Sequence, residues 1–165
     1  MSKLEACWIV LFNLFGNNPD SLSSGYQRKI TRNLYPKLQV CKNVYTEAQK
    51  QNIDPLLAIS VAYRETRFRN VESKKGAKGP MGVIPKYHCP KNKKQKCNYT
   101  KAGIHALIKY LEINEHELCP ALAQYNRGNK GKCKKGRSEY HYAQDILKIY
   151  KLLLNHNYCS SEFEC

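Results

Sequence analysis

The sequence has no apolar run long enough to cross a membrane, because a spanning helix needs about 20 such residues. The longest apolar stretch covers residues 6–15 and is interrupted by Asn13. Acidic residues are also few, with 13 Asp and Glu against 28 Lys and Arg, so the net charge is +15. This imbalance predicts an anionic partner, which is nucleic acid, an anionic cell wall or a membrane surface.

The chain also lacks internal repeats, low-complexity segments and the closely spaced cysteine pairs of a typical zinc site. Its nearest pairs, Cys89/Cys97 and Cys159/Cys165, have seven and five intervening residues, whereas zinc ligands usually have about two to four. The even count of eight cysteines favours disulfides and an oxidising compartment. The preferred local bridge joins Cys89 to Cys97. Free buried thiols and a metal site are the alternatives.

A length of 165 residues fits one domain and excludes a two-domain enzyme with a separate cofactor module. Residues 1–25 hold the apolar segment and a turn-rich linker, and residues 26–165 form the main domain. The apolar segment is open to two interpretations. Lys3 before it and small residues after it fit a signal peptide, while Glu5 and Asn13 fit a buried N-terminal helix better.

Strand signals are scarce, and apolar residues recur mainly at helical spacing. The sequence therefore predicts a mainly α fold with a basic loop or short hairpin over residues 70–100. The first strong helix start is Asp54-Pro55, an N-cap followed by proline at the first helical position, and Thr100 is the expected cap of a later helix. Predicted helices cover residues 35–52, 54–68, 100–111, 120–125 and 142–153, and the second of these has one apolar face formed by Leu56, Ile59, Ala62 and Tyr63.

Glu65 is the first candidate for chemistry, because it lies near the end of an otherwise apolar helix. The helix dipole and apolar neighbours both disfavour a negative charge there and raise the pKa of the carboxyl. A carboxyl that stays protonated near neutral pH is suited to general acid catalysis. Arg64, Arg67 and Arg69 oppose this shift if they approach it, and the alternative is an ordinary salt bridge at the helix end.

Glu65 begins the segment Glu65-Thr66-Arg67-Phe68. This segment is followed along the chain by Gly79-Pro80-Met81-Gly82, Gln124-Tyr125-Asn126 and Tyr142. In this order and spacing, residues 35–155 resemble the catalytic domain of soluble lytic transglycosylases, relatives of goose-type lysozyme. The corresponding family patterns are Glu-Ser-x-Phe, Gly-Leu-Met-Gln, Ala-Tyr-Asn and a tyrosine at the start of a late helix.

The chain departs from these patterns at four positions. Thr66 replaces serine but keeps the hydroxyl, and Gln124 replaces alanine. Pro80 and Gly82 replace leucine and glutamine, and the second change removes an amide that faces the sugar in the family. These departures bear on substrate positioning and rate.

The resemblance implies a lysozyme-like fold and cleavage of the β-1,4 bond between N-acetylmuramic acid and N-acetylglucosamine. Glu65 would act first as acid and then as base, closing a 1,6-anhydro ring with no metal or cofactor. Most glycosidases use two carboxylates, but Glu72 and Glu139, the nearest other acids, are expected to be solvated surface residues. A lysozyme-type hydrolase of the same bond is the alternative enzyme.

The resemblance also implies roles for the residues around Glu65. Thr66 and Asn126 are expected to hydrogen-bond the N-acetyl group or ring hydroxyls, and Tyr125 to shape the cleft floor. Tyr142 is expected to orient Glu65 through its phenol. Gly79 would let the backbone approach the glycan, and Met81 would form an apolar wall; simple core packing is the alternative for Tyr142 and Met81.

Two basic stretches complete the sequence. One places five lysines in Lys86–Cys97, and the other covers Arg127–Arg137. Both suit attachment to peptidoglycan and anionic wall polymers. A nucleic-acid-binding protein and a non-catalytic wall-binding module are the rival functions, although no nucleic-acid-binding signature occurs. We expect a monomer that is periplasmic, secreted or carried in a phage virion.

Overall fold

A computed structural model describes residues 2–15, 24–91 and 96–159 of the chain. The fold is mainly α, as predicted. Residues 72–83 contain two isolated antiparallel bridges, Glu72 with Lys78 and Lys78 with Val83, which form a short hairpin in the predicted loop region. The helices are α1 (Lys3–Phe15), α2 (Ser24–Lys50), α3 (Pro55–Thr66), α4 (Pro85–His88), α5 (Tyr99–Ile113), α6 (Leu118–Arg127), the 3-10 helix η2 (Gly128–Lys130) and α7 (Ser138–Cys159).

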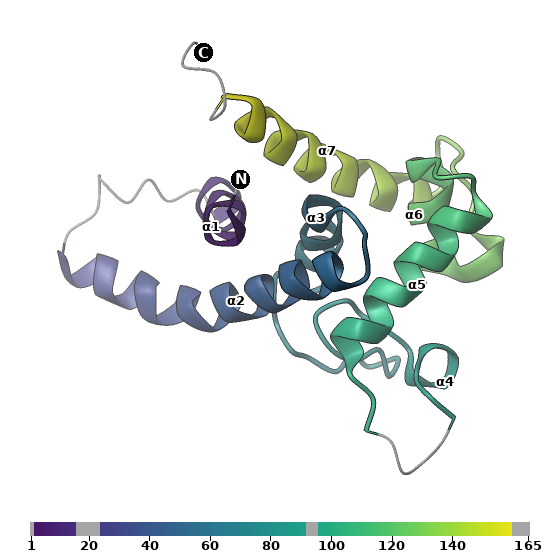
Figure 1. Cartoon of the computed structure of the whole chain (residues 1–165), viewed down its shortest axis with the longest axis horizontal. Helices are drawn as coiled ribbons and strands as arrows, with labels where there is room; N and C mark the ends of the chain where they lie inside the picture. The colour runs from purple at the N-terminus through teal and green to yellow at the C-terminus, as the bar shows by residue number, and fades with distance from the viewer. Residues whose placement is uncertain (1, 16–23, 92–95, 160–165) are drawn as a thin grey trace.

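Helix α3 is the central helix of the fold. The Asp54 side chain caps it by accepting a hydrogen bond from the Leu56 amide at 2.8 Å. The prediction of one apolar face was too narrow, because residues 56–62 are all buried. Helix α2 packs on one side of α3 and α7 on the other (Figure 1). A stretch that is apolar all round is one that is buried all round. The last turn of α3 does reach solvent, because Arg64 is exposed.

Helix α1 packs against α2 and α7, with Ala6, Cys7, Val10 and Leu11 buried. In the structure, the apolar segment is therefore a helix packed on the core. Helix α2 begins at Ser24 and continues through Pro36, earlier than the predicted start at residue 35. Most of the predicted linker, residues 16–23, lies outside the described residues.

Helices α5 and α6 pack together, and α6 packs on α7, at the other end of the molecule (Figure 1). Asn98, not Thr100, caps α5, because its side chain accepts from the Lys101 amide at 3.0 Å. Helix α6 begins at Leu118, two residues before the predicted start at Pro120. None of the described helices combines the length and apolarity required to span a membrane.

Among the described residues, three disulfides join Cys7 to Cys41, Cys89 to Cys97 and Cys119 to Cys133. The predicted Cys89–Cys97 bridge is confirmed. The first disulfide ties α1 to α2, the second ties the end of α4 to the residues before α5, and the third ties α6 to the segment before α7. Of the basic loop between Cys89 and Cys97, Lys93 and Lys94 lie outside the described residues.

We expect non-reducing peptide mapping of the oxidised protein to recover these three pairs. Replacing both Cys7 and Cys41 with serine should lower the free energy of unfolding by about 3–4 kcal/mol, because the bridge closes a loop of 34 residues in the unfolded chain. Denaturant unfolding measures the loss. A double variant as stable as the native protein would contradict a disulfide between α1 and α2.

Candidate active site

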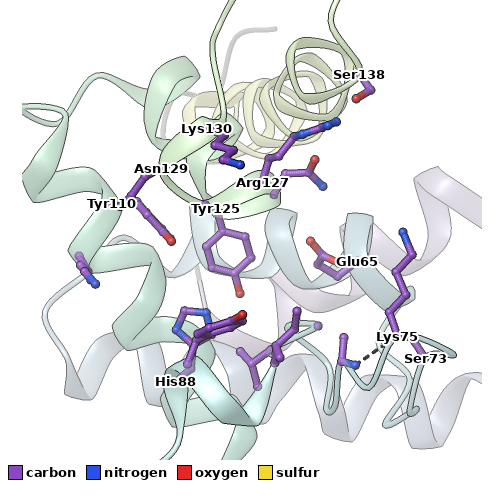
Figure 2. Close-up of a pocket in the computed structure, with 18 residues that line it drawn as sticks. Glu65, Ser73, Lys75, His88, Tyr110, Tyr125, Arg127, Asn129, Lys130 and Ser138 are labelled. Carbon is purple, nitrogen blue, oxygen red and sulfur yellow. Dashed lines mark hydrogen bonds between the residues drawn. The ribbon is translucent and has the colours of Figure 1, made fainter.

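A cavity of about 1060 Å³ opens beside the end of α3. Glu65 is its contribution from that helix, while the hairpin, α4 and α5 form one side, and α6, η2 and the start of α7 form the other (Figure 2). Described residues that line it include Glu65, Ser73, Lys75, Gly82, Val83, Ile84, Tyr87, His88, Lys109, Tyr110, Tyr125, Asn126, Arg127, Asn129, Lys130 and Ser138.

Glu65 lies in the last turn of α3, which ends where Arg67 takes a left-handed conformation with φ of 52°. The Tyr142 hydroxyl donates a hydrogen bond to Glu65 Oε1 at 2.5 Å. Burial raises the pKa of the Glu65 carboxyl, and the bond from Tyr142 and the charge of Arg64 offset part of this rise. The result is a carboxyl biased toward its protonated form, which is the form a general acid needs.

A second layer of contacts holds Tyr142 in place. The Arg64 guanidinium lies over the Tyr142 ring, 5.3 Å from its centroid. Arg64 Nε also donates to Asp145 Oδ2 at 2.9 Å. Because Tyr142 and Asp145 both belong to α7 and Arg64 to α3, this arrangement fixes the phenol against the helix that carries Glu65.

Tyr125 lies at the centre of the cavity wall in Figure 2, and its hydroxyl donates to the Met81 carbonyl at 2.8 Å. Burial, then the charge of Glu65, raises the pKa of Tyr125 and of Tyr142 well above that of an ordinary tyrosine. Both phenols therefore stay protonated and act as donors. Asn126 follows on α6 as an exposed residue of the cavity lining.

Four predicted site residues do not line the cavity. Tyr142 is buried, and it is linked to the cavity through its hydrogen bond to Glu65. Thr66 is buried, and its hydroxyl donates to the Pro80 carbonyl at 2.9 Å, so it fastens the hairpin to α3 instead of facing a sugar. Gly79 makes room for Tyr99, because an added Cβ would lie 2.5 Å from the Tyr99 Cβ. Met81 is fully buried and packs toward Gly103, which is the core alternative.

Gly82 is a site residue that the sequence analysis missed. It has φ of +63°, and an added Cβ would lie 2.6 Å from Glu65 Oε2. The sequence was interpreted there as the loss of a glutamine. In the structure, the missing side chain is what leaves space beside the carboxylate.

Glu72 and Glu139, the two other acidic candidates, differ in their exposure to solvent. Glu72 is exposed as predicted and pairs with Lys78 at 3.3 Å. The prediction for Glu139 was wrong, because this residue is 1% exposed in the first turn of α7. Backbone amides, its own first, and the Ser138 hydroxyl lower the pKa of Glu139. It is absent from the cavity lining.

The described residues contain no group of three or more His, Cys, Asp or Glu side chains placed to hold a metal ion. The chemical groups at or beside the cavity include the Glu65 carboxyl, the Tyr125 and Tyr142 phenols and several basic side chains. Comparison with protein-family models, with curated proteins and with solved structures finds no match to this chain.

Proposed function

We propose that the protein is a lytic transglycosylase that cleaves peptidoglycan strands between N-acetylmuramic acid and N-acetylglucosamine. The observation that carries the proposal is Glu65, a largely enclosed carboxyl with a raised pKa, held by Tyr142 at the wall of a large open cavity. The order of the motifs around Glu65 supports the same conclusion.

Glu65 is the one carboxylate among the described residues that line the cavity. Glycosidases that use a nucleophile or a base-activated water need a second carboxyl across the scissile bond. Glu72 and Asp145 are engaged with Lys78 and Arg64 outside the cavity. One carboxyl is enough when the attacking group belongs to the substrate, which favours the transglycosylase over a hydrolase.

In the proposed reaction, protonated Glu65 gives its proton to the glycosidic oxygen, the C1–O bond breaks and the 4-hydroxyl of N-acetylglucosamine leaves. The substrate's N-acetyl group stabilises the cationic centre at C1. Carboxylate Glu65 then takes the proton of the muramoyl 6-hydroxyl as O6 bonds to C1. The 1,6-anhydro ring forms without consuming water, and Glu65 ends protonated as it began.

Mass spectrometry of digested peptidoglycan tests the proposal. We expect released muropeptides that are lighter by one water than hydrolysed ones. Products with reducing ends would instead assign a lysozyme-type hydrolase. Absence of any muropeptide release, together with tight and salt-sensitive binding to DNA, would favour the nucleic-acid-binding alternative.

Replacing Tyr142 with phenylalanine should reveal its positioning role in the pH profile. Without the phenolic donor the Glu65 pKa rises further, so the acid form persists to higher pH and the alkaline limb of kcat moves upward. We expect activity at the optimum to fall on the order of tenfold as the carboxyl loses its orientation.

Tyr150→Phe is the matched control for this variant. Tyr150 lies on the same helix and also donates to a carboxylate, but its partner Asp54 is not part of the cavity lining, whereas Glu65 is. This change should lower stability and leave the pH profile in place. An unchanged profile in Tyr142→Phe would contradict the positioning role.

The proposed place of action is the cell wall, reached by a periplasmic, secreted or virion-borne protein. Within the described residues, six cysteines form three disulfides, and such bridges persist in oxidising compartments. The net charge of +15 fits an anionic wall as the surrounding surface.

A further inference from the structure

The cavity around Glu65 is lined by four permanent cations. They are Lys75 from the hairpin, Lys109 from α5, Arg127 at the end of α6 and Lys130 in η2. Figure 2 shows Arg127 and Lys130 beyond Tyr125 and Lys75 on the other side of Glu65. Because they come from separate elements, the positive charge surrounds the opening instead of lying at one edge.

Three of these four side chains have no ion-pair partner in the part of the chain that the structure describes: no described carboxylate lies within ion-pair distance of Lys75, Lys109 or Lys130. Arg127 forms a long ion pair with Glu139, at 4.0 Å. By contrast, Arg64 and Lys78 outside the cavity have partners at 2.9 and 3.3 Å. A cleft lined by one sign of charge focuses the field and concentrates ligands of the opposite sign.

His88 lies among the same cavity-lining residues as these basic side chains. His88 lines the cavity on α4, and burial lowers its pKa, with the charges of Lys109 and His105 adding to the effect. A positive potential disfavours a further cation at this point. Away from Glu65, the basic side chains that line the cavity favour the binding of an anionic ligand.

Resting on the proposed function, we propose that this cavity selects glycan strands that carry carboxylates over neutral strands of the same sugars. The carboxylates have two sources in peptidoglycan. One is the lactyl group of a muramoyl sugar without its peptide, and the other is the stem peptide. Lys75, Lys109, Arg127 and Lys130 would bind them while the sugar backbone passes Glu65.

Binding to the Glu65→Gln variant tests the selection without requiring cleavage. The probes are soluble peptide-free strands, soluble peptide-bearing strands and the same two preparations with their carboxylates converted to amides. We expect amidation to weaken binding by about tenfold, and added salt to shrink the difference. A difference in the peptide-free pair assigns the lactyl group, and one confined to the peptide-bearing pair assigns the peptide.

Two triple variants that lose the same number of charges distinguish the effect of the cavity cations from that of the charge on the whole surface. Changing Lys75, Lys109 and Lys130 to glutamine should abolish the preference, whereas changing Lys50, Lys148 and Lys151, three exposed lysines outside the lining, should preserve it. Equal losses in the two triple variants would overturn the inference in favour of a general surface field.

The failure of this inference is distinguishable from failure of the proposed function. Equal binding of native and amidated strands, with anhydro-muropeptides still released by the native protein, overturns the selection and leaves the transglycosylase standing. A tenfold preference in binding with no cleavage of any strand supports the selection and overturns the enzyme.

Discussion

Replacing Glu65 with glutamine should reduce muropeptide release by at least about 100-fold, because general acid–base catalysis contributes about 100- to 10,000-fold. Glutamine keeps the shape of the side chain and can still accept the hydrogen bond from Tyr142, but it has no proton to give to the glycosidic oxygen. Release of anhydro-muropeptides from purified sacculi measures the loss. Retention of more than a few per cent of native turnover would contradict the role of Glu65.

Glu72→Gln is the control carboxylate for this experiment, because Glu72 is exposed and paired only with Lys78. We expect it to keep native activity. Glu139→Gln is unsuitable as a control, since Glu139 is buried and its side chain interacts with Ser138 and Arg127. A loss there would report damage to the start of α7.

Thermal unfolding shows whether the Glu65→Gln variant is folded. Burial raises the pKa of Glu65 in the folded state, so its contribution to stability is present below the ordinary carboxyl pKa and is lost as the pH rises through the folded value. A neutral glutamine avoids that loss. We expect the variant to unfold at a higher temperature than the native protein at neutral pH and at about the same temperature near pH 3.

The helices were predictable from the sequence because capping and periodicity are local signals. Asp54-Pro55 fixes the start of α3 by itself, through a side-chain cap and a proline at the first position. The burial of residues 56–62 of α3 on all sides was not predictable in the same way. It depends on α2 and α7, which pack on opposite sides of α3. Helix α2 comes directly before α3 in the chain, whereas α7 lies much farther along it.

In the candidate site too, some features were predictable from the sequence and others depended on the fold. Glu65 and Tyr142 were predicted as a pair from motif order, and the structure brings them to 2.5 Å. Thr66 is next to Glu65 in the sequence, yet successive helical residues point in different directions, so its hydroxyl reaches the Pro80 carbonyl instead of the cavity. Motif membership therefore identified the neighbourhood, while helix geometry decided which side chains face a ligand.

The basic stretch that begins at Arg127 was predicted as a wall-binding surface. A run of basic residues in the sequence does not show which way their side chains face. The fold places Arg127 and Lys130 in the cavity lining. Glu139 was misassigned for a related reason. Its position in the first turn of α7 places its carboxylate at the positive end of the helix dipole, where a negative charge is stabilised without solvent.

Gly82→Ala should reduce activity by about 100-fold even though it adds a single methyl group. Its Cβ would lie 2.6 Å from Glu65 Oε2, closer than atoms in contact allow, so the carboxyl must move. A displacement of about 1 Å in a catalytic group costs about 100-fold in rate. The rate of muropeptide release measures the effect, and the fraction of folded protein is followed by circular dichroism.

Gly76→Ala is the control that distinguishes the contact with Glu65 Oε2 from the effect of backbone strain. Gly76 lies in the same hairpin with φ of +78°, and an added Cβ there would meet nothing within 4 Å. Both alanines occupy the left-handed region, at a cost of about 1–2 kcal/mol each, so both variants should lose similar stability. Only Gly82→Ala pushes on Glu65. Equal activities in the two variants would mean that the space beside Oε2 is not required for catalysis, whereas a loss confined to Gly82→Ala would show that this glycine keeps the acid in its working position.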